Sequence, residues 1–498
     1  MKKTLEKDRI KKGRLAVRRT HIKPRITISE KKLSVIAHSL FSAWMLSFLF
    51  EGQIFYSLAD AYKLDPAVMV FCGIAAVFAG LILCGLVIKT KKAAKRLFLS
   101  SYIFFIAVSV VFYFPPSLFW TLGLAAGSFL AGGCVAAWAF YLKSGTPKNE
   151  RLKTVADMLI LSNILMIALN MAAIHLSPYL GLALSMLMLL CAVFFAQKLP
   201  DNHNAASPIP PERKESAAKI TRLLIFLCLF ITIITINSGL MYQVVSPAFA
   251  HLEWLTSWYW AIPYIAALFV MRNLPRRLDR TYSLYVAIAM IGLSFIGFMI
   301  LGRGAISYLA INTLMLSAFG VYDLFWWSIL GEMLELHKNP ARILGVGLAA
   351  NVLGVLLGGL IGSAITSSNI SNISPTLPAL TVVCVTLALL PPLYNLLFST
   401  LKGHAFLSAF SEMPAQEQHN RIDRVARFGN LSERESQVTA LLLQGKTYKT
   451  IADELYISEN TVKYYVKSIY SKFGIQSRAQ LIDLIQKKEM ASVPKHRL

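Results

Sequence analysis

Apolar residues run in long stretches along most of the chain, and charged residues lie mainly between these stretches. Windows of about 19 residues delimit twelve of them, as expected for helices that cross the hydrocarbon core of a bilayer. They lie near 35–58, 66–88, 97–114, 118–142, 154–174, 179–197, 220–242, 256–271, 281–302, 305–331, 344–366 and 377–400. The pattern predicts an all-α, polytopic membrane domain over residues 35–400.

Shorter segments flank this membrane domain. Residues 1–34 form a basic tail, and the first apolar stretch begins too late for a secretory signal peptide. Residues 401–429 are polar and of mixed charge, which predicts a flexible connector. Residues 430–490 have the pattern of a compact soluble domain, and a tail follows at 491–498.

Helix signals divide residues 430–490 into four predicted helices. Ser432, Thr447 and Ser458 stand where the N-caps of the first three are expected. The third helix carries a regular apolar stripe, which consists of Val462, Val466, Ile469 and Phe473. The fourth, Arg478–Lys487, carries apolar residues that we expect to supply a dimer contact, namely Leu481, Ile482 and Ile485.

The net charge of +24 is concentrated beside the predicted membrane helices. Residues 1–34 contain 13 Lys and Arg against three acids, whereas residues 430–490 contain nine basic and seven acidic residues. Basic residues next to a membrane span set its orientation and meet anionic lipid. The charge therefore predicts membrane lipid as a partner more strongly than it predicts nucleic acid.

The loops differ sharply in charge between the two sides of the predicted membrane domain. Loops on the side of the N-terminus hold 20 Lys and Arg, whereas the opposite loops hold only Lys63 and Arg303. Positive loops stay on the cytoplasmic side. We therefore expect a multi-pass protein of the cytoplasmic (inner) membrane with both termini in the cytoplasm.

The longest internal connection, 198–222, contains Pro208, Pro210 and Pro211 and divides the twelve stretches into six plus six. Two halves of six helices with both ends on one side resemble the major facilitator superfamily, over residues 35–400. The loop 89–96 reads KTKKAAKR and lacks the superfamily's acidic-and-glycine signature, which counts against ordinary transport. The resemblance implies a central cavity lined by the first and tenth helices.

Ionisable residues inside a bilayer are costly and are candidates for function. Six residues of the first and tenth stretches are therefore expected to bind a small-molecule ligand or a proton: Glu51, Gln53, Tyr56, Asp323, Trp326 and Trp327. The alternative for Glu51 and Asp323 is a hydrogen bond that only holds the bundle together. In the eleventh stretch, the spacing of Gly354, Gly358 and Gly362 predicts close helix packing.

The C-terminal segment resembles the LuxR-type (GerE-like) DNA-binding domain over some 55 residues. The residues that carry the resemblance are Leu431-Ser432-Glu433-Arg434-Glu435, Gly445, Lys449, Ile451-Ala452, Leu455, Ile457-Ser458, Thr461-Val462-Lys463, Ile469, Lys472-Phe473 and Arg478. It implies a helix-turn-helix in which Lys463, Tyr464 and Lys467 meet the major groove, with Thr461 and Lys449 near phosphates. The alternative is a helical bundle with a solvated lysine face.

Two residues depart from the LuxR-type pattern. Tyr465 stands where the family usually has histidine, and Ser468 stands where asparagine is common. Both lie on the third helix, so we expect an unusual DNA target. Because the domain carries little net charge, we also expect it to bind double-stranded DNA as a homodimer or at clustered sites.

No signature of an enzyme occurs in the chain. Neither GxxxxGK[ST] nor HExxH is present, and the six cysteines lie in apolar stretches without metal-ligand spacing. We therefore expect no catalytic residue, cofactor or metal. The sequence favours a one-component membrane regulator of transcription. Two alternatives stay open, namely a secondary transporter with an attached regulatory domain, and a C-terminal module that binds protein instead of DNA.

Overall fold

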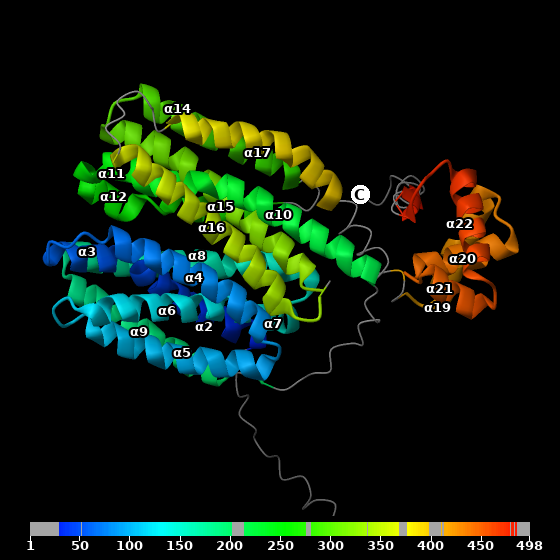
Figure 1. Cartoon of the computed structure of the whole chain (residues 1–498), viewed down its shortest axis with the longest axis horizontal. Coiled ribbons are helices and arrows are strands. Elements are labelled where there is room, and N and C mark those ends of the chain that lie inside the picture. The colour runs from blue at the N-terminus through cyan, green and yellow to red at the C-terminus, as the bar shows by residue number, and fades with distance from the viewer. Residues whose placement is uncertain are drawn as a thin grey trace, which may run out of the picture.

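The computed structural model of the chain describes residues 29–50, 52–201, 214–274, 280–335, 337–367, 376–397, 410, 413–478, 480–482 and 484–485. Its secondary structure is helical, and no strand occurs among these residues. The all-α class expected from the sequence is confirmed. Figure 1 shows a large helical bundle and a smaller C-terminal domain.

The bundle has two halves, which lie side by side in Figure 1. The first contains α2 (Glu30–Trp44), η1 (Met45–Leu49) and α3 (Gln53–Ala61); α4 (Ala67–Val87); α5 (Lys91–Val111); α6 (Leu118–Ala137) and α7 (Ala139–Gly145); η2 (Lys148–Glu150) and α8 (Arg151–His175); and α9 (Pro178–Gln197). The second contains α10 (Lys214–Leu240), η3 (Met241–Val245) and α11 (Ser246–Ala248); η4 (Ala250–Leu252), α12 (Glu253–Tyr259) and α13 (Ile262–Asn273); α14 (Arg280–Ile300); α15 (Ala305–Met333); α16 (Pro340–Ser367); and α17 (Thr376–Leu397).

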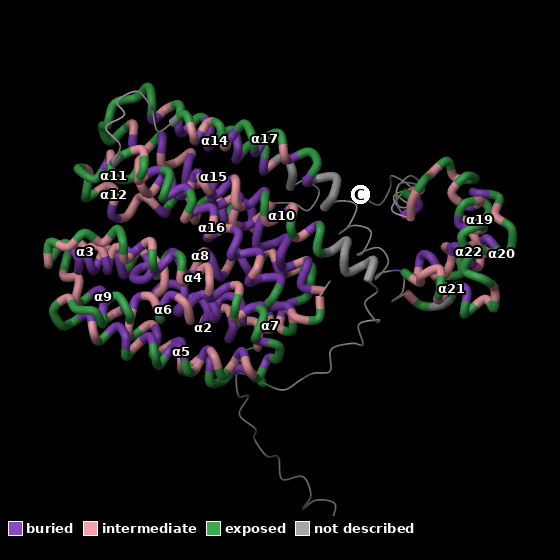
Figure 2. The backbone as a smooth tube through the Cα atoms, viewed as in Figure 1, coloured by how far each residue is buried: buried purple, intermediate pink, exposed green. Residues whose placement is uncertain are grey.

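These segments have the length and surface of membrane helices. Eleven are long and apolar enough to cross a bilayer, and the described part of α17 adds a shorter apolar helix, Leu377–Leu393. Large apolar side chains such as Ile103, Phe194 and Leu293 are exposed on the outer helices α5, α9 and α14. Figure 2 shows the buried residues gathered inside the bundle. The chain is therefore a polytopic membrane protein, and its segments coincide with the twelve predicted stretches.

The structure corrects two predicted boundaries. The first helix begins at Glu30 instead of residue 35, because Ser29 caps it by accepting a hydrogen bond from the Lys32 amide. The predicted tail 1–34 therefore ends in helix. The eighth span is present but longer than 256–271, since it extends over Ala250–Asn273, and it breaks where α12 ends at Tyr259 and α13 restarts with Pro263 in its first turn. Proline has no backbone N–H to continue a helix.

Glycines hold α10 against α16 at backbone distance. A Cβ atom on Gly358 would lie 2.1 Å from the carbonyl oxygen of Ile236, and one on Gly354 would lie 1.9 Å from Oγ1 of Thr235. A Cβ atom on Gly362 would lie 2.7 Å from Cβ of Gln243. The close packing predicted from the glycine spacing is confirmed. The two helices therefore cannot slide past each other without separating.

The first helix of each half contains a π-helical segment. The two segments, Met45–Leu49 and Met241–Val245, occupy corresponding positions six spans apart. Each is five residues long and follows directly on an α-helix, and π-helical segments occur frequently at functional sites. The correspondence supports an internal repeat of six spans.

The C-terminal domain contains α19 (Ala415–Gly429), α20 (Glu433–Leu443), α21 (Tyr448–Leu455) and α22 (Glu459–Phe473). Ser432, Thr447 and Ser458 cap the last three as predicted, by accepting hydrogen bonds from the amides of Glu435, Thr450 and Thr461. A core joins these three helices and includes Val438, Leu442, Ile451, Ala452, Val462, Val466 and Ile469. Of the predicted stripe of the third helix, Val462, Val466 and Ile469 are buried and Phe473 is half-buried.

A second core corrects the predicted connector and the predicted dimer contact. Residues 401–429 are not all connector, because the second half of this range forms α19 and buries Ile422. Leu481, Ile482 and Ile485 lie in this core with Phe410 and Leu443 and are at most 5% exposed. They are therefore unavailable for the dimer contact that their apolar pattern predicted.

Gly358→Ala should destabilise the bundle by about 1–3 kcal/mol, because the added Cβ atom pushes α10 from α16. Gly297→Ala on α14 is the control, since its Cβ atom would meet Ile311 at an ordinary 3.5 Å. Alanine is the better helix former at both sites. Thermal unfolding in lipid nanodiscs should therefore show a lower midpoint for the first variant only. Equal midpoints would contradict the proposed role of the glycine.

Candidate functional site

The recognition face predicted for the C-terminal domain is open to solvent. In α22, Val462 and Val466 are buried, whereas Lys463, Tyr464 and Lys467 are exposed. The stripe of small apolar residues fixes the inner face of the helix, and so it fixes the direction of the lysines. Nζ of Lys463 lies 3.6 Å from Glu459 one turn earlier, and both side chains stay about half exposed.

The two residues expected near phosphates lie at the starts of the helix pair. Thr461 is partly exposed, and its hydroxyl lies 2.7 Å from the hydroxyl of the cap residue Ser458. Lys449 is exposed in the first turn of α21. A shallow groove between α21 and α22 is lined by Tyr448, Lys463, Val466, Lys467, Tyr470, Ser471, Ile475 and Gln476. Basic and hydroxyl groups therefore share one side of the domain.

The two departures from the LuxR-type pattern are half-buried. Tyr465 packs against the domain core. Ser468 donates a hydrogen bond of 2.6 Å to Oε1 of Glu435. The expectation of an unusual DNA target stays a prediction, because the ring of Tyr465 also contacts Tyr464 on the recognition face, with centroids 5.9 Å apart.

Glu435 links α20 to α22. Its carboxylate accepts hydrogen bonds from the Ser432 amide at 2.7 Å, from Ser468 at 2.6 Å and from Nζ of Lys472 at 2.6 Å. Burial alone would raise the pKa of Glu435, but these donors lower it to about 2. The carboxylate therefore stays ionised at neutral pH and locks the recognition helix to the first helix.

The helix α19 contacts the far end of α22. The rings of Phe428 and Phe473 stack with centroids 6.0 Å apart, and Nζ of Lys472 donates to the carbonyl oxygen of Asn430. On the other side, Gln444 donates to Gln418 of α19 at 3.0 Å. The chain that comes from the membrane domain is thus attached to the recognition helix.

The membrane domain encloses a cavity of about 230 Å³ between its halves. The residues that line it are His38, Ser42, Met45, Leu46, Phe50, Val77, Leu81, Val135, Met158, Leu159, Ser162, Asn163, Met166, Ile234, Thr235, Ser238, Tyr242, Trp260, Tyr264, Leu316, Phe319, Tyr322, Asp323, Trp327, Leu348, Asn351, Val352 and Val355. None of them lies on α5, α9, α14 or α17, the third and sixth spans of each half. Both π-helical segments contribute residues to the lining.

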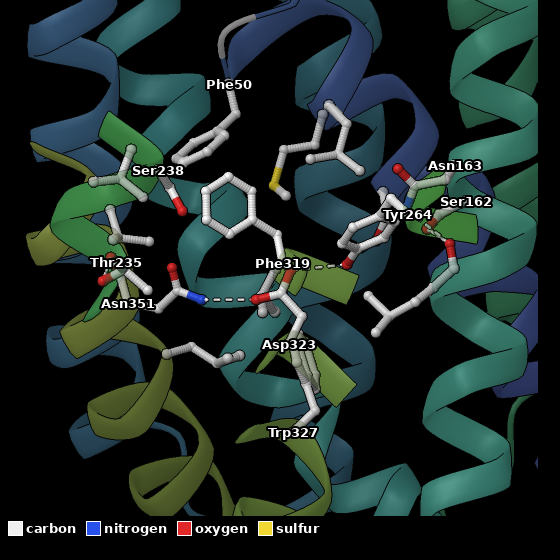
Figure 3. A pocket seen from close by; sticks show the side chains of 18 of the residues that line it. Phe50, Ser162, Asn163, Thr235, Ser238, Tyr264, Phe319, Asp323, Trp327 and Asn351 are labelled. Carbon is white, nitrogen blue, oxygen red and sulfur yellow. Dashed lines mark hydrogen bonds between the residues drawn. The ribbon is translucent and has the colours of Figure 1, made fainter. Parts of the chain in front are cut away.

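Asp323 projects into this cavity from α15, as Figure 3 shows. Its Oδ2 atom accepts a hydrogen bond of 2.8 Å from the hydroxyl of Tyr264, and its Oδ1 atom accepts one of 3.4 Å from the amide of Asn351. Tyr264 belongs to α13 and Asn351 to α16. Neutral groups from two helices therefore hold the carboxylate in place.

The predicted ligand residues are only partly brought together. Asp323 and Trp327 line the cavity, whereas Gln53, Tyr56 and Trp326 are not among its lining residues. Glu51 lies outside the described residues. Tyr264 and Asn351 also line the cavity and were not predicted as site residues. Polar residues within apolar stretches were the available signal, but nothing in the sequence shows which helices they face.

Arg151 joins the two halves at the ends of α8 and α15. The guanidinium is buried and donates to the carbonyl oxygen of Gly331 at 2.8 Å and to Oε1 of Glu335 at 2.5 Å. It also donates to the carbonyl oxygens of Thr146 and Lys143 in its own half. Burial alone would raise the pKa of Glu335, but the hydrogen bond and charge of Arg151 lower it.

A second ion pair joins the same halves. Arg272 of α13 donates to both carboxylate oxygens of Asp157 on α8, at 2.5 and 3.2 Å. Two-point arginine–carboxylate pairs are geometrically specific. Asp157 and Glu335 are therefore neutralised by arginines across the seam between the halves.

The C-terminal domain matches a known sequence family. The family described as bacterial regulatory proteins, luxR family, matches residues 429–485. The spore germination protein GerE of Bacillus subtilis is 41% identical over 61 residues, which are 12% of this chain and 82% of GerE. The transcriptional regulatory protein LnrK of Bacillus subtilis is 43% identical over 61 residues, which are 12% of this chain and 28% of LnrK. The likeness therefore spans most of GerE but less than a third of LnrK.

The membrane domain resembles solved transporters in fold. The human organic anion transporter MFSD10 (TETRAN) has a TM-score of 0.53 and 12% identity, over 74% of this chain and 98% of that chain. FucP, a Major Facilitator Superfamily transporter in the outward conformation, has a TM-score of 0.51 and 15% identity, over 72% of this chain and 98% of that chain. These likenesses show the fold, and the architecture expected for the membrane domain is confirmed.

Arg151→Gln should lower the thermal midpoint in nanodiscs more than Glu335→Gln does. The arginine variant deprives four acceptors of their donor and leaves Glu335 with only the more distant Lys143, at 3.9 Å, at a cost of about 2–4 kcal/mol. Arg342→Gln is the control, because that arginine is exposed at the start of α16. The double variant should cost less than the sum of the two single ones. Strictly additive costs would show that Arg151 and Glu335 do not interact.

Glu435→Gln should destabilise a fragment of residues 410–498 by about 1–3 kcal/mol at pH 7. The folded pKa of Glu435 is about 2, below the ordinary value of 4.5. The stabilisation by the carboxylate is therefore present above pH 4.5 and is lost as the pH falls toward 2. Circular dichroism melts from pH 7 to pH 2.5 should show the two proteins converge. A difference that does not change with pH would contradict this role.

Proposed function

Because the chain belongs, through its C-terminal domain, to the luxR family of bacterial regulatory proteins, we propose that it is a membrane-integrated one-component regulator of transcription. The C-terminal domain binds double-stranded DNA. The membrane domain senses a small molecule and changes that binding. The observation that carries the proposal is the exposed Lys463–Lys467 face of α22, presented beside α21 in the same chain as a facilitator-like fold.

The DNA contacts divide by chemistry. Lys463, Tyr464 and Lys467 are the candidates for the major groove, because they are exposed on the outer face of α22. Thr461 and Lys449 are the candidates for phosphates, which position the helix without reading sequence. The exposed lysines alone also fit a solvated surface, but the family match makes DNA the better interpretation.

Two copies are expected on DNA, because one copy offers few cations to the phosphates. Residues 430–490 carry a surplus of only two positive charges. A protein that neutralises few phosphates binds weakly at physiological salt. Leu481, Ile482 and Ile485 are buried within the domain, so pairing uses another surface or follows a rearrangement of α19.

The signal is expected to start at the cavity and to travel through α15. This helix carries Asp323 at the cavity and Gly331 beside Arg151 at the seam. A ligand that binds one arrangement of the halves better shifts the population toward that arrangement. The chain then reaches the C-terminal domain through α17 and α19, and α19 contacts α22.

The orientation follows from charge. The loops on the N-terminal side hold 20 of the 22 Lys and Arg in the loops between the spans. We therefore place the protein in the cytoplasmic membrane with both termini in the cytoplasm, where the C-terminal domain meets DNA and the basic residues meet lipid. No catalytic residue or cofactor is part of the proposal.

Transport is the second candidate function. The fold resemblance to FucP and the cavity between the halves favour it. The loop 89–96, which lacks the superfamily's acidic-and-glycine signature, counts against it. Uptake into proteoliposomes that depends on a proton gradient would establish transport. Sensing requires only that the ligand bind the two arrangements with different affinity.

The test is footprinting of the full-length protein in nanodiscs on DNA that flanks its own gene. Lys463→Ala with Lys467→Ala should abolish a discrete footprint, and the slope of log affinity against log salt should fall by about 1–2, because two phosphate- or base-directed charges are removed. Arg424→Ala with Arg434→Ala removes two exposed charges from α19 and α20 and is the control. A footprint retained by the lysine variant would overturn the DNA site.

A further inference from the structure

The described lining of the cavity contains one carboxylate and neither lysine nor arginine. Asp323 is the only Asp or Glu among the described residues that line it, and no Lys or Arg is among them. The hydrogen-bond donors to its two oxygens are the hydroxyl of Tyr264 and the amide of Asn351, both neutral. The carboxylate is therefore held in position without being neutralised.

Other acidic residues at the edges of the bundle form ion pairs with Lys or Arg. Asp157 pairs with Arg272, Glu335 with Arg151, and Glu30 with Lys91. Each of these ion pairs offsets the cost of placing a carboxylate near the membrane interior. Asp323 lies at the cavity, where solvent or a ligand reaches it, and there the protein supplies no cation among the described lining residues. An ionised Asp323 therefore leaves one negative charge that a bound cation can neutralise.

Aromatic rings surround the carboxylate. The aromatic residues that line the cavity are Phe50, Tyr242, Trp260, Tyr264, Phe319, Tyr322 and Trp327. Figure 3 shows Phe319, Tyr264 and Trp327 close around Asp323, with Phe50 across the cavity. Faces of aromatic rings attract cations, most strongly when water is excluded.

From this combination we infer that the cavity binds a small organic cation, an ammonium group with an apolar or aromatic body. The inference rests on the proposed function and names the class of its ligand. The ammonium group pairs with Asp323, and the body occupies the space between Phe319, Trp327 and Phe50. A cavity of about 230 Å³ has room for a compact amine.

The same lining disfavours an anion. An anionic ligand would meet the charge of Asp323 without any lysine or arginine among the described lining residues. His38 is the remaining basic side chain there. Its ring is 2% exposed and stacks on Trp138 with centroids 4.6 Å apart, and neither ring nitrogen has a hydrogen-bond partner in the described part of the chain. Protonation of a ring in this apolar setting is costly, so His38 offers polarity without charge.

The experiment compares three probes of similar size and different charge: phenethylammonium, 2-phenylethanol and 3-phenylpropionate. Equilibrium dialysis against full-length protein in nanodiscs, without DNA and corrected with empty nanodiscs, measures binding. Phenethylammonium should bind at least tenfold more tightly than the alcohol, and the carboxylate should bind weakest. Equal binding of all three, or preference for the carboxylate, would overturn the inference.

Variants identify the group responsible. Asp323→Asn should lose the tenfold preference for phenethylammonium, whereas Asp60→Asn, an exposed acid at the end of α3, should keep it. If Asp323→Asn does not fold, the probe series on the natural protein decides. Unchanged preference in a folded Asp323→Asn protein would overturn the assignment to Asp323.

Dialysis tests the cation site, and the footprint tests sensing, so each hypothesis can be contradicted without the other. Charge-selective binding without any effect of phenethylammonium on the footprint would keep the cation site and contradict sensing. A footprint that responds to the alcohol or the carboxylate, without selective cation binding, would keep sensing and overturn the cation inference.

Discussion

The buried guanidinium of Arg151 is the interaction on which the arrangement of the membrane domain depends. It ties the start of α8 to the end of α15, and so it joins the two halves at one point. Asp323 lies eight residues before Gly331 on the same helix, about 12 Å along its axis. Any movement of α15 that favours a ligand at Asp323 therefore also acts on the bonds of Arg151. The helix α15 therefore connects the cavity, at Asp323, to the seam, at Gly331.

Close packing makes such a movement collective. Gly358 and Gly354 bring α10 and α16 to backbone distance, and Gly132 brings α6 equally close to Val77 of α4. Helices packed in this way transmit displacement instead of absorbing it, because a gap of less than an ångström already removes much of the dispersion energy between them. The seam between the halves is held by both kinds of contact. A Cβ atom on Gly345 of α16 would lie 2.4 Å from the carbonyl oxygen of Leu81 on α4, and the two arginine–carboxylate pairs join other helices across the same seam. Because ion pairs can break and reform whereas the glycine contact stays closed, rotation of one half about the contact between α4 and α16 is the favoured movement.

The sequence predicted the features that depend on residues close together in the chain. It did not predict the contacts between side chains on different helices. The twelve spans and the caps at Ser432, Thr447 and Ser458 follow from periodicity and from short-range hydrogen bonds. Asp323 was also found, since a charge in an apolar stretch is visible. Its partners Tyr264 and Asn351 lie on other helices, so the sequence does not show that they contact it. Arg151 stands in a predicted loop with several other basic residues, and nothing in the sequence distinguishes it from them. The sequence of α19 indicates a connector, because its few apolar residues stand among polar ones and form a core only with Leu481 and Ile482.

The position of α19 also constrains how regulation reaches DNA. It contacts the C-terminal end of α22 through Phe428 and Phe473, whereas Lys463 lies in the first half of α22 and Lys467 near its middle, and both stay exposed. A shift of α19 therefore leaves the DNA-facing groups intact. Glu435 resists internal change as well, because it ties α22 to α20 with a carboxylate that remains ionised. A shift of α19 can instead expose Leu481, Ile482 and Ile485, the apolar residues that α19 covers through Ile422. Regulation through this route acts on how two domains are placed along DNA, and the chemistry of each contact with the bases stays constant.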